Sequence, residues 1–597
     1  MPGRRPNLTR RGLFRGMAGG AALLGAGVPG HAAASSSRVL QVEPPPEVPR
    51  AETLVVCAAD HAFTFGDAGW MNPFLPGMSQ SGVQFAFEPL AMYHVLTGEA
   101  VPWLAAEWAY DDDATELTVG LRPGITWSDG RPLTATDVVA TLRLLRDGPA
   151  SLRAAAAVQD RFREARASDD LTVLLGFRNA DPRFFHDVLA AAGDRALPIV
   201  PAHVWAEQDP ETFRNIDPEK GWPVVSGPYR LVADSADGRL WDRRDDWWAA
   251  TTGFETLPAP RRILWRPRYD DSHLARLAVD AEVDTTPPLT PSRIATALSI
   301  APSLTSPTGA EPPFGAVDWR PLVLGFNAQL APWDDPAMRR AANHAIDRAE
   351  LVRAGELGRG QAATLPFPDF PAFETIAADL APLLERFPVD AYDPDQTTAL
   401  LRGRGYVRAP GGVFARGGEA LTLPLVTAPE HAGVAAVLVT QLRRAGIDAT
   451  VELPPDAPGR IAQGIAVAWL WPHGGGVRDP YLTLDRYHGR HAVPTGEVAL
   501  SPSRWRDDAF DAIVDRLLTL PPEGEDAGAA VIEAMAIWLA DLPEIPLVQT
   551  FSRIPLGTRY WTGWPDTATG RDPASWRTTF LPSLLALRPA PPPGDGD

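Results

Sequence analysis

The chain has one cysteine, Cys57, and one lysine, Lys220, among 597 residues. A single cysteine excludes an intrachain disulfide and every zinc or iron–sulfur site built from several cysteines. Cys57 lies in the apolar run TLVVCAA without an activating neighbour. We therefore interpret it as a small buried strand residue and not as a nucleophile.

Positive charge is scarce outside the N-terminus. Residues 1–34 hold five arginines and no acidic residue, and the rest of the chain has 50 basic and 74 acidic residues, a net charge of −24. A body with this charge repels phosphates and anionic lipids. We expect neither nucleic acid nor an anionic membrane surface as a partner.

No segment is long and apolar enough to span a bilayer. The N-terminal TRRGLFRG (9–16) places paired arginines before a weakly apolar, glycine-rich stretch, and Ala32 and Ala34 suit cleavage before Ser35. This arrangement resembles a twin-arginine export signal, with an ordinary Sec signal as the alternative. No cysteine follows the apolar stretch, which excludes a lipid anchor there. We expect a soluble protein that is exported to the periplasm or another extracytoplasmic space and is not inserted in the membrane.

Motifs of catalysis are absent. The sequence contains no H-E-x-x-H, no G-x-x-x-x-G-K-[ST] and no G-x-S-x-G. The one compact histidine pair, His488 and His491, flanks Arg490, whose charge opposes metal binding. We expect no catalytic residue, no metal site and no cofactor. A pair of distant carboxylates is not excluded, so a secreted hydrolase is the alternative from another functional class.

Strand and helix patterns alternate between many prolines and glycines without a fixed repeat, which favours an α/β body of more than one lobe. ELTVGL (116–121) alternates as a half-buried strand. A helix is expected between Thr134 and Gly148, because Thr134 and Asp137 form a capping-box pattern. Its apolar face is Val138, Leu142 and Leu145.

A second helix is expected to begin at Asp335. Asp335 can cap it and Pro336 suits its first turn. Apolar residues then recur at helical spacing as far as Val352, which predicts one continuous helix over 336–352.

Several of these segments together resemble one family. LTVGLRPGITWSDGRPLTATDVVATL (117–142) is similar to the signature region of family 5 bacterial extracellular solute-binding proteins, the oligopeptide- and dipeptide-binding proteins of ABC importers. Further similar segments follow in the family's order between Leu54 and Leu556. They include NPFLPG (72–77), LPIVPAHVW (197–205), SGPYRLV (226–232), LGFNAQLAPWDDPAMRRAANHAIDRAELV (324–352) and LADLPEIPLVQ (539–549).

The resemblance implies a two-lobe periplasmic-binding-protein clamshell of type II, with the extra subdomain of the peptide-binding class. It implies a monomer without enzymatic activity that binds a small-molecule or peptide solute and delivers it to ABC transporter permease subunits, with crossings between lobes near Arg320 and Pro546. The expected parts are a signal peptide (1–34), a linker (35–50), lobe I (51–316, with the extra subdomain at about 73–224), lobe II (317–545), a return to lobe I (546–588) and a disordered tail (589–597).

The loop AWLWPHGGGVRDP (468–480) bears on the ligand. Peptide-binding members of the family carry an aspartate just after the tryptophan of this loop, where it pairs with the peptide's amino group. Here Trp471 is followed by no acid before Asp479. An oligopeptide or modified peptide is the preferred ligand, and an oligosaccharide, which stacks on tryptophan, is the alternative. The expected ligand-binding residues are Trp70, Asn72, Trp469, Trp471, His473 and Gly474.

Overall fold

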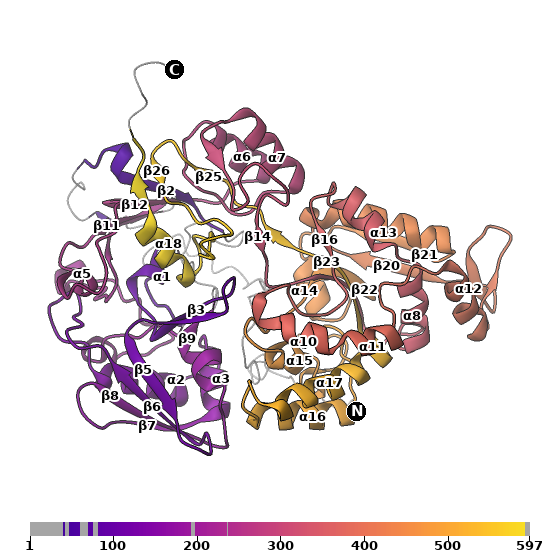
Figure 1. Ribbon diagram of the computed structural model, residues 1–597, viewed down its shortest axis with the longest axis horizontal. Coiled ribbons are helices and arrows are strands. Elements are labelled where there is room, and N and C mark those ends of the chain that lie inside the picture. The colour runs from indigo at the N-terminus through magenta and orange to yellow at the C-terminus, as the bar shows by residue number, and fades with distance from the viewer. Residues whose placement is uncertain are drawn as a thin grey trace, which may run out of the picture.

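The computed structural model describes residues 40–41, 47–59, 70–75, 81–192, 197–235 and 237–591. The expected signal peptide and residues 592–597 of the expected tail lie outside the described residues. Figure 1 shows two lobes side by side, with β14 between them. The predicted two-lobe α/β architecture is confirmed.

Lobe I is built on a five-stranded sheet. Its order is β1 (Leu40–Gln41), β10 (Tyr229–Ser235), β11 (Gly238–Arg243), β12 (Arg262–Arg266) and β2 (Thr53–Cys57). Strand β1 falls within the expected linker and pairs with β10. Cys57 packs among the apolar side chains of α6 (Asp271–Val279) and α7 (Pro291–Ile300), and burial raises its pKa to about 12. The prediction of a buried strand cysteine is confirmed.

The extra part of lobe I contains a four-stranded sheet. Its order is β5 (Ala105–Tyr110), β6 (Glu116–Leu121), β8 (Thr172–Phe177) and β7 (Phe162–Ala167). Strand β6 alternates exposed and buried residues as predicted. Helix α2 (Ala135–Asp147) has the expected capping box between Thr134 and Asp137. Both predictions are confirmed.

A smaller sheet brings this part of lobe I to the other lobe. Its order is β4 (Glu99–Pro102), β3 (Ala91–His94) and β9 (Ala190–Ala191). The π-helical turn η2 (Phe185–Leu189) leads directly into β9. Shorter elements complete lobe I: α1 (Val83–Ala86), α3 (Ala155–Arg161), α4 (Ala202–Trp205), α5 (Trp248–Thr251), α18 (Leu581–Ala586), β13 (Leu304–Thr305), β25 (Leu556–Gly557), β26 (Trp561–Thr562) and β27 (Arg588–Pro589).

Lobe II is built on a six-stranded mixed sheet. Its order is β16 (Gln361–Ala362), β23 (Glu544–Gln549), β15 (Leu322–Phe326), β22 (Ala468–Pro472), β20 (Thr422–Val426) and β21 (Asp448–Glu452). Its longer helices are α8 (Pro336–His344), α12 (Pro394–Gly403), α13 (Ala432–Ala445), α16 (Asp508–Thr519) and α17 (Glu525–Asp541). Shorter elements are α10 (Glu374–Asp379), α11 (Ala381–Arg386), α14 (Ala457–Ala462), α15 (Tyr481–Asp485) and the β17–β18–β19 meander (Val407–Arg408, Phe414–Arg416, Glu419–Ala420).

The helix expected over 336–352 is interrupted, so this prediction is wrong in its second half. Asp335 caps α8 as predicted, but α8 ends at His344. The side chain of Asp347 then accepts a hydrogen bond from the backbone N–H of Glu350 and begins the short α9 (Arg348–Glu350). Asp347 competes with the helix for a backbone donor, which splits the apolar pattern between two elements.

Two short antiparallel strands join the lobes. β14 (Ala316–Val317) pairs with β24 (Phe551–Ser552), and the hydroxyl of Ser552 donates to Asp318 at 2.6 Å. Pro546, near which the second crossing is expected, lies inside β23 opposite Val323. The crossing strand β24 follows further along the chain, so the lobe boundaries named above stay predictions.

Candidate functional site

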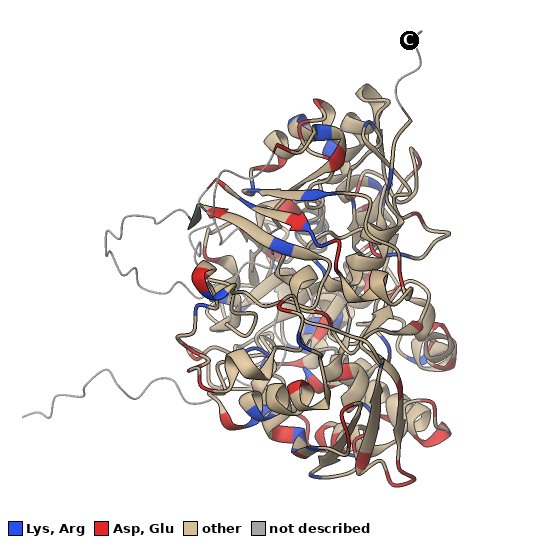
Figure 2. Ribbon diagram, turned by 90° about the vertical axis from the view of Figure 1, so that its left-hand side faces the viewer, with Lys and Arg blue, Asp and Glu red and all other residues tan. Residues whose placement is uncertain are grey.

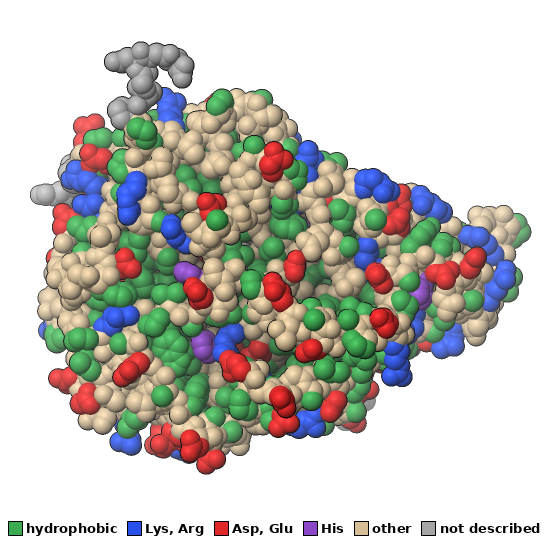
Figure 3. All heavy atoms as spheres, in the orientation of Figure 1, with side chains coloured by type: hydrophobic (Ala, Val, Ile, Leu, Met, Phe, Trp, Pro, Cys, Tyr) green, Lys and Arg blue, Asp and Glu red, His purple; other side chains and the backbone are tan. Residues whose placement is uncertain are grey.

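The two lobes are closed on each other in the structure. The apolar cluster of lobe II extends across the seam between the lobes and takes in Tyr93, Val95 and Ala192 of lobe I. Figure 3 shows the lobes meeting over most of this face, with apolar side chains gathered between them. Buried apolar contact of this kind stabilises the closed arrangement.

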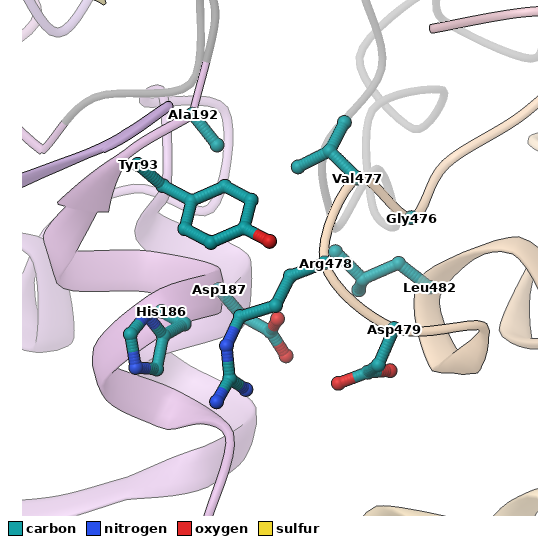
Figure 4. A pocket seen from close by; sticks show the side chains of 9 residues that line it. All are labelled: Tyr93, His186, Asp187, Ala192, Gly476, Val477, Arg478, Asp479 and Leu482. Carbon is teal, nitrogen blue, oxygen red and sulfur yellow. The ribbon is translucent and has the colours of Figure 1, made fainter. Parts of the chain in front are cut away.

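A pocket lies in this seam and is lined by both lobes (Figure 4). The pocket is open to solvent, and its empty space, with the open part counted, is about 360 Å³. Four lining residues belong to lobe I and five to the loop and first turn that follow β22. They are Tyr93, His186, Asp187 and Ala192, and Gly476, Val477, Arg478, Asp479 and Leu482. Only closed lobes bring the two groups together.

Each pocket carboxylate has an arginine partner. Asp187 pairs with Arg161 at 3.1 Å, and Asp479 pairs with Arg183 at 3.2 Å. Arg478 extends between His186 and Asp479 in Figure 4 and pairs with an exposed glutamate of its own lobe, Glu523. The charges of the pocket are therefore nearly balanced, while Tyr93, Ala192, Val477 and Leu482 give it an apolar part.

Burial shifts the pKa values of Asp187 and His186, and it also raises the pKa of Tyr93. It raises the pKa of the Asp187 carboxyl to about 6, a shift that Asp479 increases and Arg161 opposes. Burial lowers the pKa of His186 to about 4, and the charge of Arg478 adds to this shift. His186 is accordingly neutral at pH 7, and Asp187 changes charge near pH 6.

The glycines of the loop bring it back against α15. The backbone N–H groups of Gly475 and Gly476 both donate to the Thr483 hydroxyl, at 3.2 and 2.8 Å. A Cβ at position 475 would lie 2.5 Å from the carbonyl oxygen of Leu482, so a side chain cannot be accommodated. The close approach turns the loop toward lobe I and presents Arg478 and Asp479 to the pocket.

His473 and Gly474 lie in the first half of this loop and do not line the pocket. His473 is buried, its Nδ1 is 2.9 Å from Glu544 Oε2, and its ring stacks on Tyr487 at 4.7 Å. The Tyr487 hydroxyl donates to the same Glu544 oxygen at 2.9 Å. A buried carboxylate, that of Glu544, thus lies beside the loop although the sequence supplies no acid directly after Trp471.

The two tryptophans of β22 share one face of the lobe II sheet. Residues two apart on a strand point to the same side. Trp469 is buried, with Gly325 against its indole, and packs with Val426 and Ile461. Trp471 is half-buried, and its ring meets that of His431 edge-on at 6.0 Å.

Trp70 and Asn72 lie in lobe I and do not line the seam pocket. The Arg214 guanidinium lies 4.9 Å from the Trp70 ring centroid. Both N–H bonds of the Asn72 amide are used, since it donates to the carbonyls of Pro210 and Phe213 at 2.8 and 3.0 Å. The ligand-binding role of the six residues named from the sequence stays a prediction.

Sequence reasoning missed the charged residues of the pocket. Asp479 stands out in the sequence only as part of the Asp-Pro pair that ends the loop. His186 and Asp187 have no local signal, because a π-helical turn before a two-residue strand places them. Within the described residues, no three His, Cys, Asp or Glu side chains are grouped so as to hold a metal ion. A search of the same residues for a membrane-spanning helix finds no candidate.

Comparisons with known proteins agree on one family. The family model described as bacterial extracellular solute-binding proteins, family 5 Middle, matches residues 99–492. Protein XP55 of Streptomyces lividans is 28% identical over 421 residues, 68% of each chain. A glutathione-binding protein of Pectobacterium atrosepticum is 26% identical over 411 residues, 67% of this chain and 68% of its own. The mannohexaose-bound periplasmic oligopeptide-binding protein of a Thermotoga maritima ABC transporter has the same fold, with a TM-score of 0.75 and 21% identity over 91% of this chain and 99% of that one.

Proposed function

The chain belongs to the family 5 bacterial extracellular solute-binding proteins, and from this we propose that it is the substrate-binding component of an ABC importer. It captures an oligopeptide or modified peptide outside the cytoplasm by lobe closure and delivers it to the membrane permease. The observation that carries the proposal is the seam pocket, whose lining comes from both lobes. A solute that contacts both lobes favours the closed form by its differential affinity for that form.

The remaining parts of the proposal follow from this role. The protein acts as an exported monomer without catalytic activity, and the lobe boundaries are those expected from the sequence. Figure 2 shows Asp and Glu residues distributed over many helices, strands and loops, and the net charge of the chain is −19, as suits a protein that does not bind nucleic acid.

Isothermal titration calorimetry tests the function. The purified protein is titrated with di- to nonapeptides, with reduced glutathione, and with β-linked oligosaccharides. We expect saturable binding of a peptide class, together with a change in tryptophan fluorescence. Binding of oligosaccharides alone would show that the ligand is a sugar and not a peptide. Turnover of a solute without stable binding would show a secreted hydrolase and overturn the proposal.

Replacing Trp471 by alanine is expected to weaken binding of a solute found in that screen by about 1 kcal/mol or more, because the half-buried indole offers a flat apolar surface beside the loop. Calorimetry of the variant measures the effect. Trp222→Ala is the matched control, since Trp222 is also half-buried but packs on Phe213 in lobe I. Equal affinity of Trp471→Ala and the unsubstituted protein would return Trp471 to a purely structural role.

A further inference from the structure

Arg183 belongs to lobe I, but its guanidinium makes its hydrogen bonds in lobe II. Nε donates to Asp479 Oδ2 at 3.2 Å. Nη1 donates to the backbone carbonyls of Leu517 at 2.6 Å and Leu518 at 3.2 Å, and also to that of Leu520. The side chain is 2% exposed. No acceptor of this guanidinium among the described residues lies in its own lobe.

The carbonyl acceptors lie in the last turn of α16 (Leu517 and Leu518) and at Leu520, the residue that follows the helix. The last carbonyl groups of a helix lack the N–H partners of a further turn, although the Leu517 carbonyl also accepts from the Leu520 N–H. The partial negative charge at a helix C-terminus attracts a cation, and the Asp479 carboxylate adds a full charge beside it. The Tyr481 ring covers the guanidinium, with Cζ 5.5 Å from its centroid. Arg183 thus occupies a negatively polarised socket, here defined as Asp479, Tyr481 and the carbonyls of residues 517, 518 and 520.

Lobe I holds Arg183 in position for this socket. The backbone N–H of Arg183 donates to Asp181 Oδ1 at 3.3 Å, and the Arg161 guanidinium grips both oxygens of Asp181, at 2.7 and 2.6 Å. The segment that carries Arg183 is therefore fixed from within its own lobe. Opening the lobes would withdraw the side chain from all its acceptors at once.

We propose that Arg183 is the latch of the clamshell, a positioning residue that holds lobe I on the C-terminus of α16 and sets how often the lobes close before a solute binds. The proposal rests on the proposed function, since lobe closure is the act of capture. Each hydrogen bond that Arg183 makes across the seam involves its charged guanidinium. Losing even one such bond changes the equilibrium constant of lobe closure about tenfold or more. Apparent solute affinity falls with the fraction of protein able to close.

Electron–electron distance measurements on the solute-free protein test the latch. Spin labels are placed at Thr118→Cys on β6 and Asp526→Cys on α17, both exposed, while the buried Cys57 does not react. The unsubstituted protein is expected to show a closed population at short distance. Arg183→Ala should lower the ratio of closed to open protein about tenfold or more. Arg183→Lys keeps the positive charge but lacks the planar guanidinium, so its ratio should lie between those of Arg183→Ala and the unsubstituted protein.

Asp479→Asn removes the carboxylate charge of the socket in lobe II. It should also lower the ratio of closed to open protein. Arg178→Ala is the matched control, because this exposed arginine of lobe I donates to the Gln159 carbonyl in its own lobe. Unchanged distances in Arg183→Ala and Asp479→Asn, or the absence of a closed population in the unsubstituted protein, would overturn the latch. Because no solute is present, this result is independent of the calorimetry that tests the proposed function.

Discussion

Replacing Gly227 by alanine is expected to lower the free energy of unfolding by about 3 kcal/mol or more, because the added methyl group has no space. Gly227 lies two residues before β10 in lobe I, and its N–H donates to the carbonyl of Ala86 at 3.0 Å. A Cβ here would overlap the carbonyl oxygen of Phe85 and lie 2.8 Å from its carbon. Both atoms are backbone, so no side-chain rotation relieves the clash. Chemical denaturation followed by circular dichroism measures the loss.

Gly528 supplies the control for this substitution. It lies inside α17, and no atom would come within 4 Å of a Cβ added there. Gly528→Ala should raise the free energy of unfolding by about 0.5–1 kcal/mol, since alanine loses less backbone entropy in a helix. A Gly227→Ala variant as stable as the unsubstituted protein would show that β10 and α1 separate easily.

Local sequence patterns predicted the elements whose stabilising contacts are local. Thr134 and Asp137 fix the start of α2 through hydrogen bonds within one turn, and the alternation in ELTVGL places the buried face of β6. The helical spacing of apolar residues over 336–352 predicted too long a helix, because such spacing does not reveal where a side chain accepts a hydrogen bond from a backbone N–H. Asp347 does so, and ends the continuous helix.

The seam could not be predicted in the same way, because its partners are distant in the chain. Arg183 and Asp479 are 296 positions apart. In the sequence, an arginine after a proline and an aspartate before a proline are both most simply interpreted as surface residues. Only the closed lobes bring Arg183 and Asp479 together. The family resemblance supplied the two-lobe arrangement but not this contact.

The loop after β22 contributes to the seam pocket, but the residues that the sequence singles out in this loop are not those that line the pocket. The sequence directs attention to its tryptophans and histidine, whereas the seam pocket is lined by residues 476–479. Strand geometry explains the difference. Strand β22 continues to Pro472, and Trp469 within it is buried in an apolar cluster. The chain approaches lobe I only after the turn at Gly475 and Gly476.

Replacing Arg161 by alanine is expected to lower the free energy of unfolding by about 3–5 kcal/mol, the cost of leaving buried carboxylates without their cation. The Arg161 side chain is 9% exposed, and its partners Asp181 and Asp187 are 4% and 12% exposed. Urea denaturation measures the loss. Arg163→Ala, two positions away, removes a half-exposed pair with Glu164 at 3.4 Å and should change stability by less than about 0.5 kcal/mol.

A double variant tells whether Arg161 acts through Asp181. If the ion pair is the cause, Arg161→Ala combined with Asp181→Ala should cost less than the sum of the single substitutions, because the second removes a charge that the first left unpaired. Strict additivity would contradict this account and assign the loss to packing of the arginine stem. Since Asp181 also holds the backbone of Arg183, Arg161→Ala should reduce the closed population in the distance measurement, and Arg163→Ala should not.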